Sequence, residues 1–309
     1  MEESKKWFAI VNPVSGFGKV KKEWQAISEE LKRQGIEFDF EFTTASAKGD
    51  ELAHKAISNG YRRLICVGGD GHLHDVVNGV MTQAYVPSTE ITIAMISQGT
   101  GNDWIKTNGV PKDIKKAINV IKQGKTYIQN AGLAQSYRDG QAVSRYFHNF
   151  AGVGFDAYVV QNTISSKSYG QIAYLLVMLR SLFSYQKPVL RITLDDRVIE
   201  TKTYLTLSGI GRFGGGGMKL TPNAKPDGDA FNVSVAKDFS KLDVFRYIGK
   251  LYDGSFIKLD KAEAHMSKHI RIEVISSEQE IYMEADGDMM GTGPFEISLV
   301  PHALKVVIP

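Results

Sequence analysis

The chain has 309 residues, of which 43% are hydrophobic and 23% are charged, with a formal net charge of +3. This composition excludes a disordered or fibrous chain and is typical of a globular protein of about two domains. The mild positive charge suits anionic ligands or an acidic membrane surface and does not indicate nucleic acid binding. A single cysteine excludes an internal disulfide, no signal-peptide pattern opens the sequence, and the longest apolar run, 172–179, is too short to span a bilayer. We therefore expect a cytoplasmic protein.

Strand and helix patterns alternate four times in the first half of the chain. The strand patterns lie at 7–11, 38–42, 64–67 and 91–96. Helical faces, with apolar residues spaced three and four apart, follow at 24–31, 52–57, 73–80 and 114–121. Because parallel strands need crossover connections, this alternation predicts an α/β domain with a parallel sheet and right-handed crossovers.

Three polar loops follow three of these strands, at 12–19 (NPVSGFGK), 68–71 (GGDG) and 99–103 (GTGND). In a parallel sheet all three lie at the carboxyl edge, where ligands bind. The loops are not those of two familiar nucleotide folds. Pro13 stands where a P-loop needs glycine, and no GxGxxG opens the first helix.

The GGDG loop has two readings. A strand that turns through glycines into a helix presents free backbone N–H groups, which favour phosphate. An aspartate there repels phosphate unless a divalent cation lies between them, or else Asp70 only caps the helix. The convergence of two glycine-rich loops with Asp70 and Asp103 favours a phosphate and metal site.

The second half of the chain changes to short strands. Strand patterns lie at 147–150, 203–210, 231–236, 270–275, 281–285, 295–300 and 304–308, with a hairpin at 190–200. Helical patterns lie at 171–185 and 242–252. This arrangement predicts an antiparallel β-sandwich or open barrel that carries one or two helices.

Several of these motifs, in this order, resemble the diacylglycerol kinase catalytic-domain family, which includes bacterial lipid kinases and sphingosine kinases. The resemblance covers nearly the whole chain. It rests on Asn12-Pro13 with Ser15-Gly16, GGDG at 68–71, Val76-Val77-Asn78-Gly79, GTGND at 99–103, AGVGFDA at 151–157, the glycine run before Pro222, and Asp286-Gly287-Asp288.

The resemblance implies an α/β plus β fold, with a nucleotide-binding domain at 1–130 and a β-sandwich-like lipid domain at 131–295. The active site is expected between them, and residues 296–309 are expected to return to the first domain. It also implies ATP, Mg²⁺ and a diacylglycerol-like lipid with a free hydroxyl. Such a protein is expected to associate peripherally with a membrane, and a homodimer remains open.

The candidate site residues divide by role. Asp70 and Asp286 are the candidate catalytic residues, with Asp286 as the general base that the resemblance implies, although Asp-Gly is also a strong hairpin-turn signal. The candidate ligands of Mg²⁺ are Asp70, Asp103 and, by resemblance, Asp227. The candidate nucleotide-binding residues are Asn12, Ser15, Gly16, Lys19, Gly68, Gly69, Asp70, Gly71, Gly99, Thr100, Gly101 and Asn102. Lys19 reads equally well as a solvated lysine.

The chain departs from the family pattern at four places. His72 and His74 replace residues that are usual after GGDG, and Asn130 stands where the family often has an aspartate. Asp227-Gly228-Asp229 reorders a metal-binding Asp-Asp-Gly. Two alternatives to diacylglycerol phosphorylation stay open because of these departures: a sphingoid-base or other lipid kinase, which His74 favours, and a nucleotide- or lipid-binding protein without catalysis, which His72 and Asn130 favour. A third, a soluble NAD kinase-like enzyme, shares GGDG but not AGVGFDA or the late Asp-Gly-Asp.

Overall fold

The computed structural model describes residues 6–163 and 180–309, which fall into two units. The first unit comprises residues 1–131, 215–217 and 301–309, and the second comprises residues 132–214 and 218–300. For comparison, the sequence prediction placed its boundary after residue 130 and its return to the first domain at residue 296. Within the described residues, no helix has the length and apolarity that crossing a bilayer requires.

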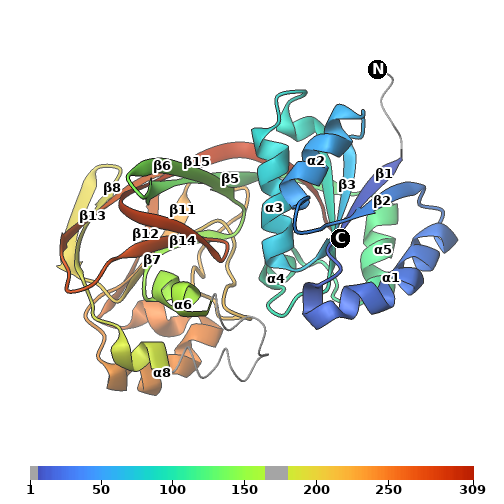
Figure 1. The fold of residues 1–309 in the computed structure, drawn as a ribbon. Coiled ribbons are helices and arrows are strands. Elements are labelled where there is room, and N and C mark those ends of the chain that lie inside the picture. The colour runs from blue at the N-terminus through green and yellow to red at the C-terminus, as the bar shows by residue number, and fades with distance from the viewer. Residues whose placement is uncertain (1–5, 164–179) are drawn as a thin grey trace. The chain divides into compact units, whose positions relative to one another are not determined.

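The first unit is an α/β fold around a parallel sheet, as predicted (Figure 1). The strand order is β15-β4-β3-β1-β2, and every neighbouring pair is parallel. The strands are β1 (Trp7–Val11), β2 (Phe38–Phe42), β3 (Arg63–Gly68), β4 (Thr92–Ser97) and the end of β15 (Asp288–Val307). The helices are α1 (Ser15–Arg33), α2 (Gly49–Ser58), α3 (Asp70–Thr82), η1 (Ser88–Glu90), α4 (Asp103–Asn108) and α5 (Ile114–Gln123).

Helices cover both faces of this sheet, which explains why its central strands are apolar throughout. Strand β1 is buried along its whole length. Its side chains alternate, so Trp7, Ala9 and Val11 face the core that α1 and α5 share. Helix α2 packs against α3 and contacts β1 (Figure 1). The carboxyl ends of the strands consequently open into loops that start helices on both faces.

The second unit is built mainly from antiparallel strands, again as predicted. The order β12-β11-β10-β7-β14-β15 forms its main path, while β13 pairs with β15 and β8, β9 pairs with β8, and β5 pairs with β6 and β15. The strands are β5 (Thr126–Arg138), β6 (Gln141–Phe147), β7 (Phe150–Gly154), β8 (Val189–Leu194), β9 (Arg197–Lys202), β10 (Leu205–Gly209), β11 (Phe231–Ala236), β12 (Ala262–Ser267), β13 (His269–Ser276), β14 (Tyr282–Ala285) and β15. Its described helices include α6 (Phe155–Thr163), α8 (Lys241–Asp253) and η3 (Ser255–Lys258).

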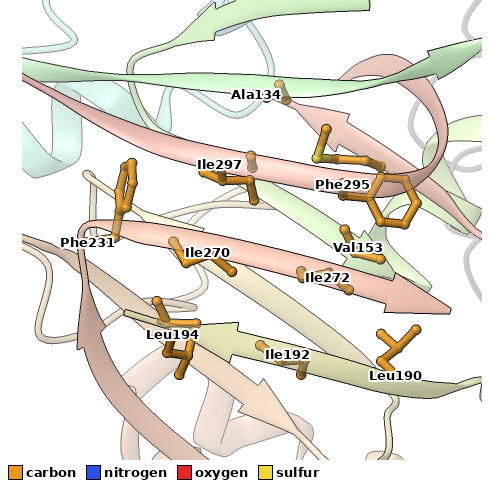
Figure 2. Close-up of a cluster of buried hydrophobic side chains, with 14 of the residues drawn as sticks. Ala134, Val153, Leu190, Ile192, Leu194, Phe231, Ile270, Ile272, Phe295 and Ile297 are labelled. Atoms are coloured by element: carbon orange, nitrogen blue, oxygen red, sulfur yellow. The ribbon is translucent and has the colours of Figure 1, made fainter. Parts of the chain in front are cut away.

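Inward-facing side chains of these strands form one hydrophobic cluster (Figure 2). Phe147 and Phe231 stack within it, with ring centroids 5.7 Å apart. Strand β5 passes this ring pair at Gly132, where a Cβ atom would lie 2.1 Å from the Phe147 ring. Glycine is therefore required here to let backbone approach an aromatic side chain.

The strand limits differ from the prediction in four places. The two strands expected at 295–300 and 304–308 are one continuous β15, and the hairpin β5–β6 and strand β12 were not predicted. The strand expected at 147–150 is replaced by the end of β6, a turn and the start of β7. Of the helix predicted at 171–185, residues 171–179 lie outside the described residues, and residues 180–184 are helical.

Candidate active site

The three predicted loops of the first unit lie against one another. At Gly16 a Cβ atom would lie 2.5 Å from the carbonyl oxygen of Gln98, which connects the first loop to the end of β4. At Gly99 a Cβ atom would lie 2.6 Å from the Cα of Gly69, which connects the third loop to the second. Side chains at these positions would separate the loops, so the glycines allow the close approach. The three loops at the carboxyl edge of the sheet therefore meet through their backbone.

The GGDG segment forms the predicted strand-to-helix turn. Strand β3 ends at Gly68, Gly69 is the N-cap residue of α3, and no side chain caps this helix. A Cβ atom at Gly71 would meet nothing within 4 Å. The thirteen-residue helix therefore starts at a glycine-rich turn whose first-turn N–H groups no side chain caps. Such a helix end attracts anions, because its orphan donors and its dipole act together.

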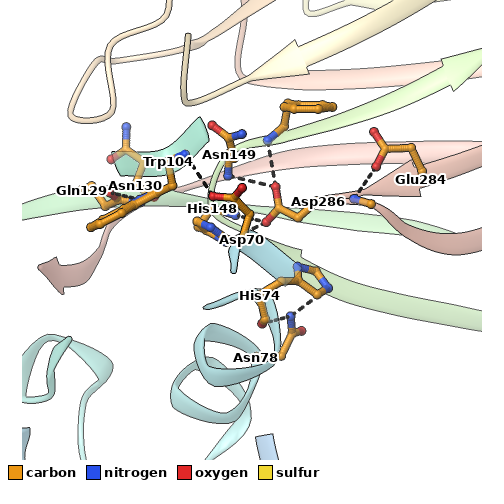
Figure 3. A network of polar contacts seen from close by, with 12 residues as sticks. Asp70, His74, Asn78, Trp104, Gln129, Asn130, His148, Asn149, Glu284 and Asp286 are labelled. Carbon is orange, nitrogen blue, oxygen red and sulfur yellow. Dashed lines mark hydrogen bonds and ion pairs between the residues drawn. The ribbon is translucent and has the colours of Figure 1, made fainter. Parts of the chain in front are cut away.

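Asp70 caps a helix, but not the one that it begins. Its Oδ2 accepts a hydrogen bond from the backbone N–H of Asp103 at 3.1 Å, and its Oδ1 accepts one from that of Trp104 at 3.2 Å (Figure 3). The carboxylate therefore holds the N-terminus of α4 and ties the GGDG loop to the GTGND loop. The sequence analysis weighed ligand binding against capping of the helix that Asp70 begins, and the hydrogen bonds of the carboxylate run to α4 instead.

Asp103 has its own set of partners. Its Oδ1 accepts a hydrogen bond from Lys106 Nζ at 2.8 Å, and its Oδ2 accepts one from the backbone N–H of Gly216 at 2.8 Å. Lys106 also donates to the carbonyl oxygen of Gly101 at 2.9 Å. The sequence analysis did not single out Lys106, although its position three residues after Asp103 on one helix was an available signal.

Three further predicted residues contact their neighbours along the chain. Asn12 Oδ1 accepts a hydrogen bond from the N–H of Val14 at 3.1 Å. Asn102 adopts a left-handed conformation with φ of 52°, and its amide donates to the carbonyl oxygen of Gly99 at 2.7 Å. Lys19 is 55% exposed and lies 3.6 Å from Glu23. The two amides therefore organise backbone, while Lys19 sits in the solvated setting that was its alternative reading.

His72 has a structural role in the first unit. Its buried ring packs over Gly68, and its Nε2 donates to the carbonyl oxygen of Ile10 at 3.0 Å. Burial lowers the pKa of His72 to about 4, so the imidazole is neutral at physiological pH. This departure from the family pattern fills space behind the GGDG turn and adds no charge to the loop.

The other two departures in this unit are also buried. His74 lies fully inside the protein, with its Nε2 3.4 Å from the amide nitrogen of Asn78. Asn130 accepts a hydrogen bond from the backbone N–H of His302 at 2.9 Å. Asn130 thus anchors the returning C-terminal segment, a task for which an amide serves without the charge of an aspartate.

Asp286 begins the turn between β14 and β15 in the second unit. Its φ of 49° is left-handed, and its carboxylate accepts hydrogen bonds from the backbone N–H groups of His148, Asn149 and Phe150 at 2.8, 3.1 and 3.0 Å (Figure 3). The Nδ1 of His148 lies 2.7 Å from Asp286 Oδ2, and both side chains are 1% exposed. These bonds explain why residues 148 and 149 separate β6 from β7. Their N–H groups donate to Asp286 and not to a neighbouring strand.

A second turn in the same unit repeats part of this arrangement. Asp195, between β8 and β9, also has a left-handed φ, of 40°. Its carboxylate accepts hydrogen bonds from the backbone N–H groups of Lys268 and His269, both at 3.0 Å. The turn alone therefore does not distinguish Asp286. What distinguishes it is burial together with the close imidazole of His148.

A buried pair of carboxyl groups lies next to the Asp286 turn. Glu284 Oε2 accepts a hydrogen bond from the backbone N–H of Gly287 at 2.6 Å, and the Glu284 and Asp156 side chains share a hydrogen bond. Burial raises the pKa of Asp156 to about 7, and burial together with the nearby Asp156 raises the pKa of Glu284 well above its usual range. Sequence reasoning missed this pair, because its members are far apart in the chain.

The first unit fits a magnesium ion better than the loop that contains Asp227. A Cβ atom placed on Gly101 would lie 3.1 Å from Oδ2 of Asp70 and 3.1 Å from Oδ2 of Asp103. Two carboxylates therefore flank this backbone position. Carboxylate oxygens are hard ligands that suit Mg²⁺, directly or through water. Asp227 is exposed, and in the described part of the chain neither it nor the Asp70–Asp103 pair belongs to a group of three metal-ligating side chains.

A cavity of about 670 Å³ lies elsewhere in the first unit. Its lining includes Trp7, Arg63 and Thr92, which are the first residues of β1, β3 and β4. It therefore opens at the amino ends of the strands, away from the loops described above, and none of the predicted site residues lines it.

Comparison with known proteins gives a consistent result. The family model of the diacylglycerol kinase catalytic domain matches residues 6–132, and that of the YegS C-terminal NAD kinase beta sandwich-like domain matches residues 149–308. The chain is 28% identical to a diacylglycerol kinase of Mycobacterium tuberculosis (97% of this chain, 94% of that protein) and 26% identical to one of Bacillus subtilis (97% and 95%). A crystal structure of a diacylglycerol kinase from Bacillus anthracis shares the fold, with a TM-score of 0.74 at 23% identity, over 99% of this chain and 98% of that one.

Proposed function

The chain belongs to the diacylglycerol kinase catalytic-domain family of lipid kinases, and from this membership we propose that it transfers the γ-phosphate of ATP to a hydroxyl of a diacylglycerol-like lipid. We further propose that the reaction depends on Mg²⁺ and takes place at the cytoplasmic surface of a membrane, to which the protein binds peripherally.

The observation that carries this proposal is the convergence of the three carboxyl-edge loops in the first unit. Gly69 and Gly99 bring backbone together, α3 presents N–H groups that no side chain caps, and Asp70 joins the second loop to the third. Phosphoryl transfer relies mainly on positioned phosphates and on neutralised charge. A backbone-lined anion site bordered by carboxylates provides both requirements.

Magnesium, when bound, would neutralise phosphate charge and would be held by Asp70 and Asp103. The protein's own residues have separate tasks in this proposal. The N–H groups at the start of α3 bind phosphate oxygens, and Asn12 and Asn102 keep the neighbouring loops in shape. Lys106 keeps Asp103 from facing the phosphates as an unpaired charge.

Asp286 is the proposed general base. The proton of the acceptor hydroxyl must leave as the oxygen attacks phosphorus, and a carboxylate within hydrogen-bonding distance of that hydroxyl accepts it. Three backbone N–H groups donate to the carboxylate and fix its orientation, and the Nδ1 of His148 lies 2.7 Å from one of its oxygens.

The test is transfer of label from γ-labelled ATP, with Mg²⁺, to a panel of detergent-dispersed lipids. Asp70→Asn removes one negative charge at nearly constant shape, and we expect it to lower turnover at least about a hundredfold. The matched control is Asp113→Asn, because Asp113 also caps a helix, α5, through its carboxylate. An unchanged rate in Asp70→Asn would contradict the proposed site.

A second pair of variants tests the base. Asp286→Asn is expected to lower turnover at least about a hundredfold while ATP still binds, because the base acts on the acceptor and not on the nucleotide. Asp195→Asn makes the same change in the other left-handed hairpin turn, so it controls for the structural cost. Equal loss in both variants would mean that Asp286 serves only the turn.

The panel also separates the alternatives. Label on a sphingoid base and on no diacylglycerol would assign the other lipid class, and label on NAD without lipid would assign a soluble kinase. ATP binding without label on any acceptor would indicate a binding protein. The buried, neutral placement of His72 removes one of the reasons to expect lost catalysis.

A further inference from the structure

Helix α8 of the second unit carries apolar side chains on its outer face as well as on its inner face. Val244, Tyr247 and Leu251, spaced as one helical stripe, pack against a hydrophobic cluster of the unit. None of the thirteen residues of α8 is fully buried. A surface helix normally turns charged side chains outward, so the residues on the opposite side of α8 call for a separate explanation.

That opposite side is a stripe of large apolar residues. Leu242 is 80% exposed, Phe245 is 45% exposed and Tyr252 is 55% exposed. Their spacing of three and seven places them along one line of the helix, with Gly249 between the last two. Phe183, which is 58% exposed, adds to the stripe, since its ring centroid lies 6.0 Å from that of Phe245.

Basic side chains border this stripe. Lys241 Nζ lies 5.7 Å from the centroid of the Phe183 ring and donates to the Phe183 carbonyl oxygen, while Arg246 and Lys250 follow along the helix. The acidic Asp243 is occupied, because it caps the helix start and pairs with Lys261. The rim is therefore cationic overall, and Asp253 is the other acidic residue of the helix.

We propose that the outer face of α8, with Phe183, docks on an anionic phospholipid surface. Exposed apolar side chains bordered by lysine and arginine have the composition of helices that lie in the headgroup layer, where apolar groups enter the acyl boundary and cations meet anionic lipids. The inference extends the proposed function, since an acceptor lipid resides in a membrane, but it does not depend on catalysis. A second copy of this chain is the competing occupant, and the cationic rim disfavours it because two identical rims would repel.

The experiment is co-sedimentation of the full chain with vesicles, without ATP. Vesicles of phosphatidylcholine with phosphatidylglycerol are compared with vesicles of phosphatidylcholine alone. We expect binding to the anionic vesicles that weakens as salt is raised. The double variant Leu242→Asp and Phe245→Asp should bind more than about tenfold more weakly, because it removes apolar contact and adds negative charge. Arg246→Glu should weaken binding about fivefold or more.

The matched control is Val198→Asp, an apolar-to-acidic change at a 59% exposed position on β9. It should bind vesicles as the unsubstituted chain does, and urea denaturation of each variant verifies that it is folded. Equal binding by the double variant and the control would overturn the proposal. The proposal would also be overturned if the unsubstituted chain forms dimers and the double variant disrupts them without changing vesicle binding. The outer face of α8 would then bind a second copy of the chain.

Activity measurements separate this inference from the proposed function. With a short-chain, water-soluble acceptor, the double variant should keep the turnover of the unsubstituted chain, whereas on vesicle-borne lipid it should lose it. If no acceptor is phosphorylated by any form, the proposed function fails, and the vesicle-binding result still decides the role of α8.

Discussion

Asp156→Asn should change how the stability of the protein depends on pH. Both carboxyl oxygens of Asp156 and the Oε1 of Glu284 are buried, and the two side chains share a hydrogen bond. Two carboxyl groups share a hydrogen bond only when one of them carries a proton. The folded protein therefore keeps a proton on this pair at pH values where the unfolded chain has released it.

The sign and size follow from the pKa values. In the folded state burial raises the pKa of Asp156 from 3.8 to about 7. Between these values the folded state binds more protons than the unfolded state, so the free energy of unfolding falls as pH rises. One proton corresponds to about 1.4 kcal/mol per pH unit, which gives about 4 kcal/mol across the interval for Asp156. This contribution is complete below pH 4 and is lost by about pH 7, and the raised pKa of Glu284 acts in the same direction.

Urea denaturation at constant ionic strength, at pH 5, 6, 7 and 8, measures this slope. The amide of Asp156→Asn donates to Glu284 at every pH, so the variant should lose about 1.4 kcal/mol less per pH unit between pH 5 and 7. The control is Asp139→Asn, an exposed aspartate in the β5–β6 turn whose left-handed φ asparagine also accepts. Parallel profiles for the unsubstituted chain and Asp156→Asn would refute a shared proton.

Two further predictions concern backbone and caps. Gly99→Ala should lower ATP affinity and should lower stability by about 1–3 kcal/mol, because its Cβ would lie 2.6 Å from the Cα of Gly69. Equilibrium binding measures the first effect and urea denaturation the second. An unchanged ATP affinity would argue against a nucleotide site at these loops. Ser240→Ala should lower stability by about 1 kcal/mol, because Ser240 and Asp243 form a capping box at the start of α8. Thermal unfolding measures this loss. An unchanged midpoint temperature of unfolding would show that packing alone holds this helix in place.

The sequence predicted the fold well where one local pattern decided the structure. The alternation of apolar strands with helical faces gave the parallel sheet, and glycine-rich loops marked its carboxyl edge. Patterns failed where a distant residue intervened. The strand expected at 147–150 is interrupted because three consecutive N–H groups bond to Asp286, which lies more than a hundred residues further along the chain.

The same limit applies to the candidate site. The sequence indicated that Asp70 and Asp103 would lie at one edge, since both follow strands of a parallel sheet. It did not indicate that Asp70 would cap α4, because the alternative considered was a cap on the helix that Asp70 itself begins. The partnership of Glu284 with Asp156 left no local signal, since it depends on which strands become neighbours.

The path of β15 has a consequence for how the protein forms during translation. Residues 301–309 belong to the first unit, where Lys305 and Val306 pair with the first residues of β4. Until that segment has been made, β4 presents an unpaired edge, and unpaired edges invite wrong partners. The first unit is thus completed by residues that are added after the second unit has been made. A nascent chain halted before residue 301 should consequently need chaperone protection that a chain containing residues 301–309 does not.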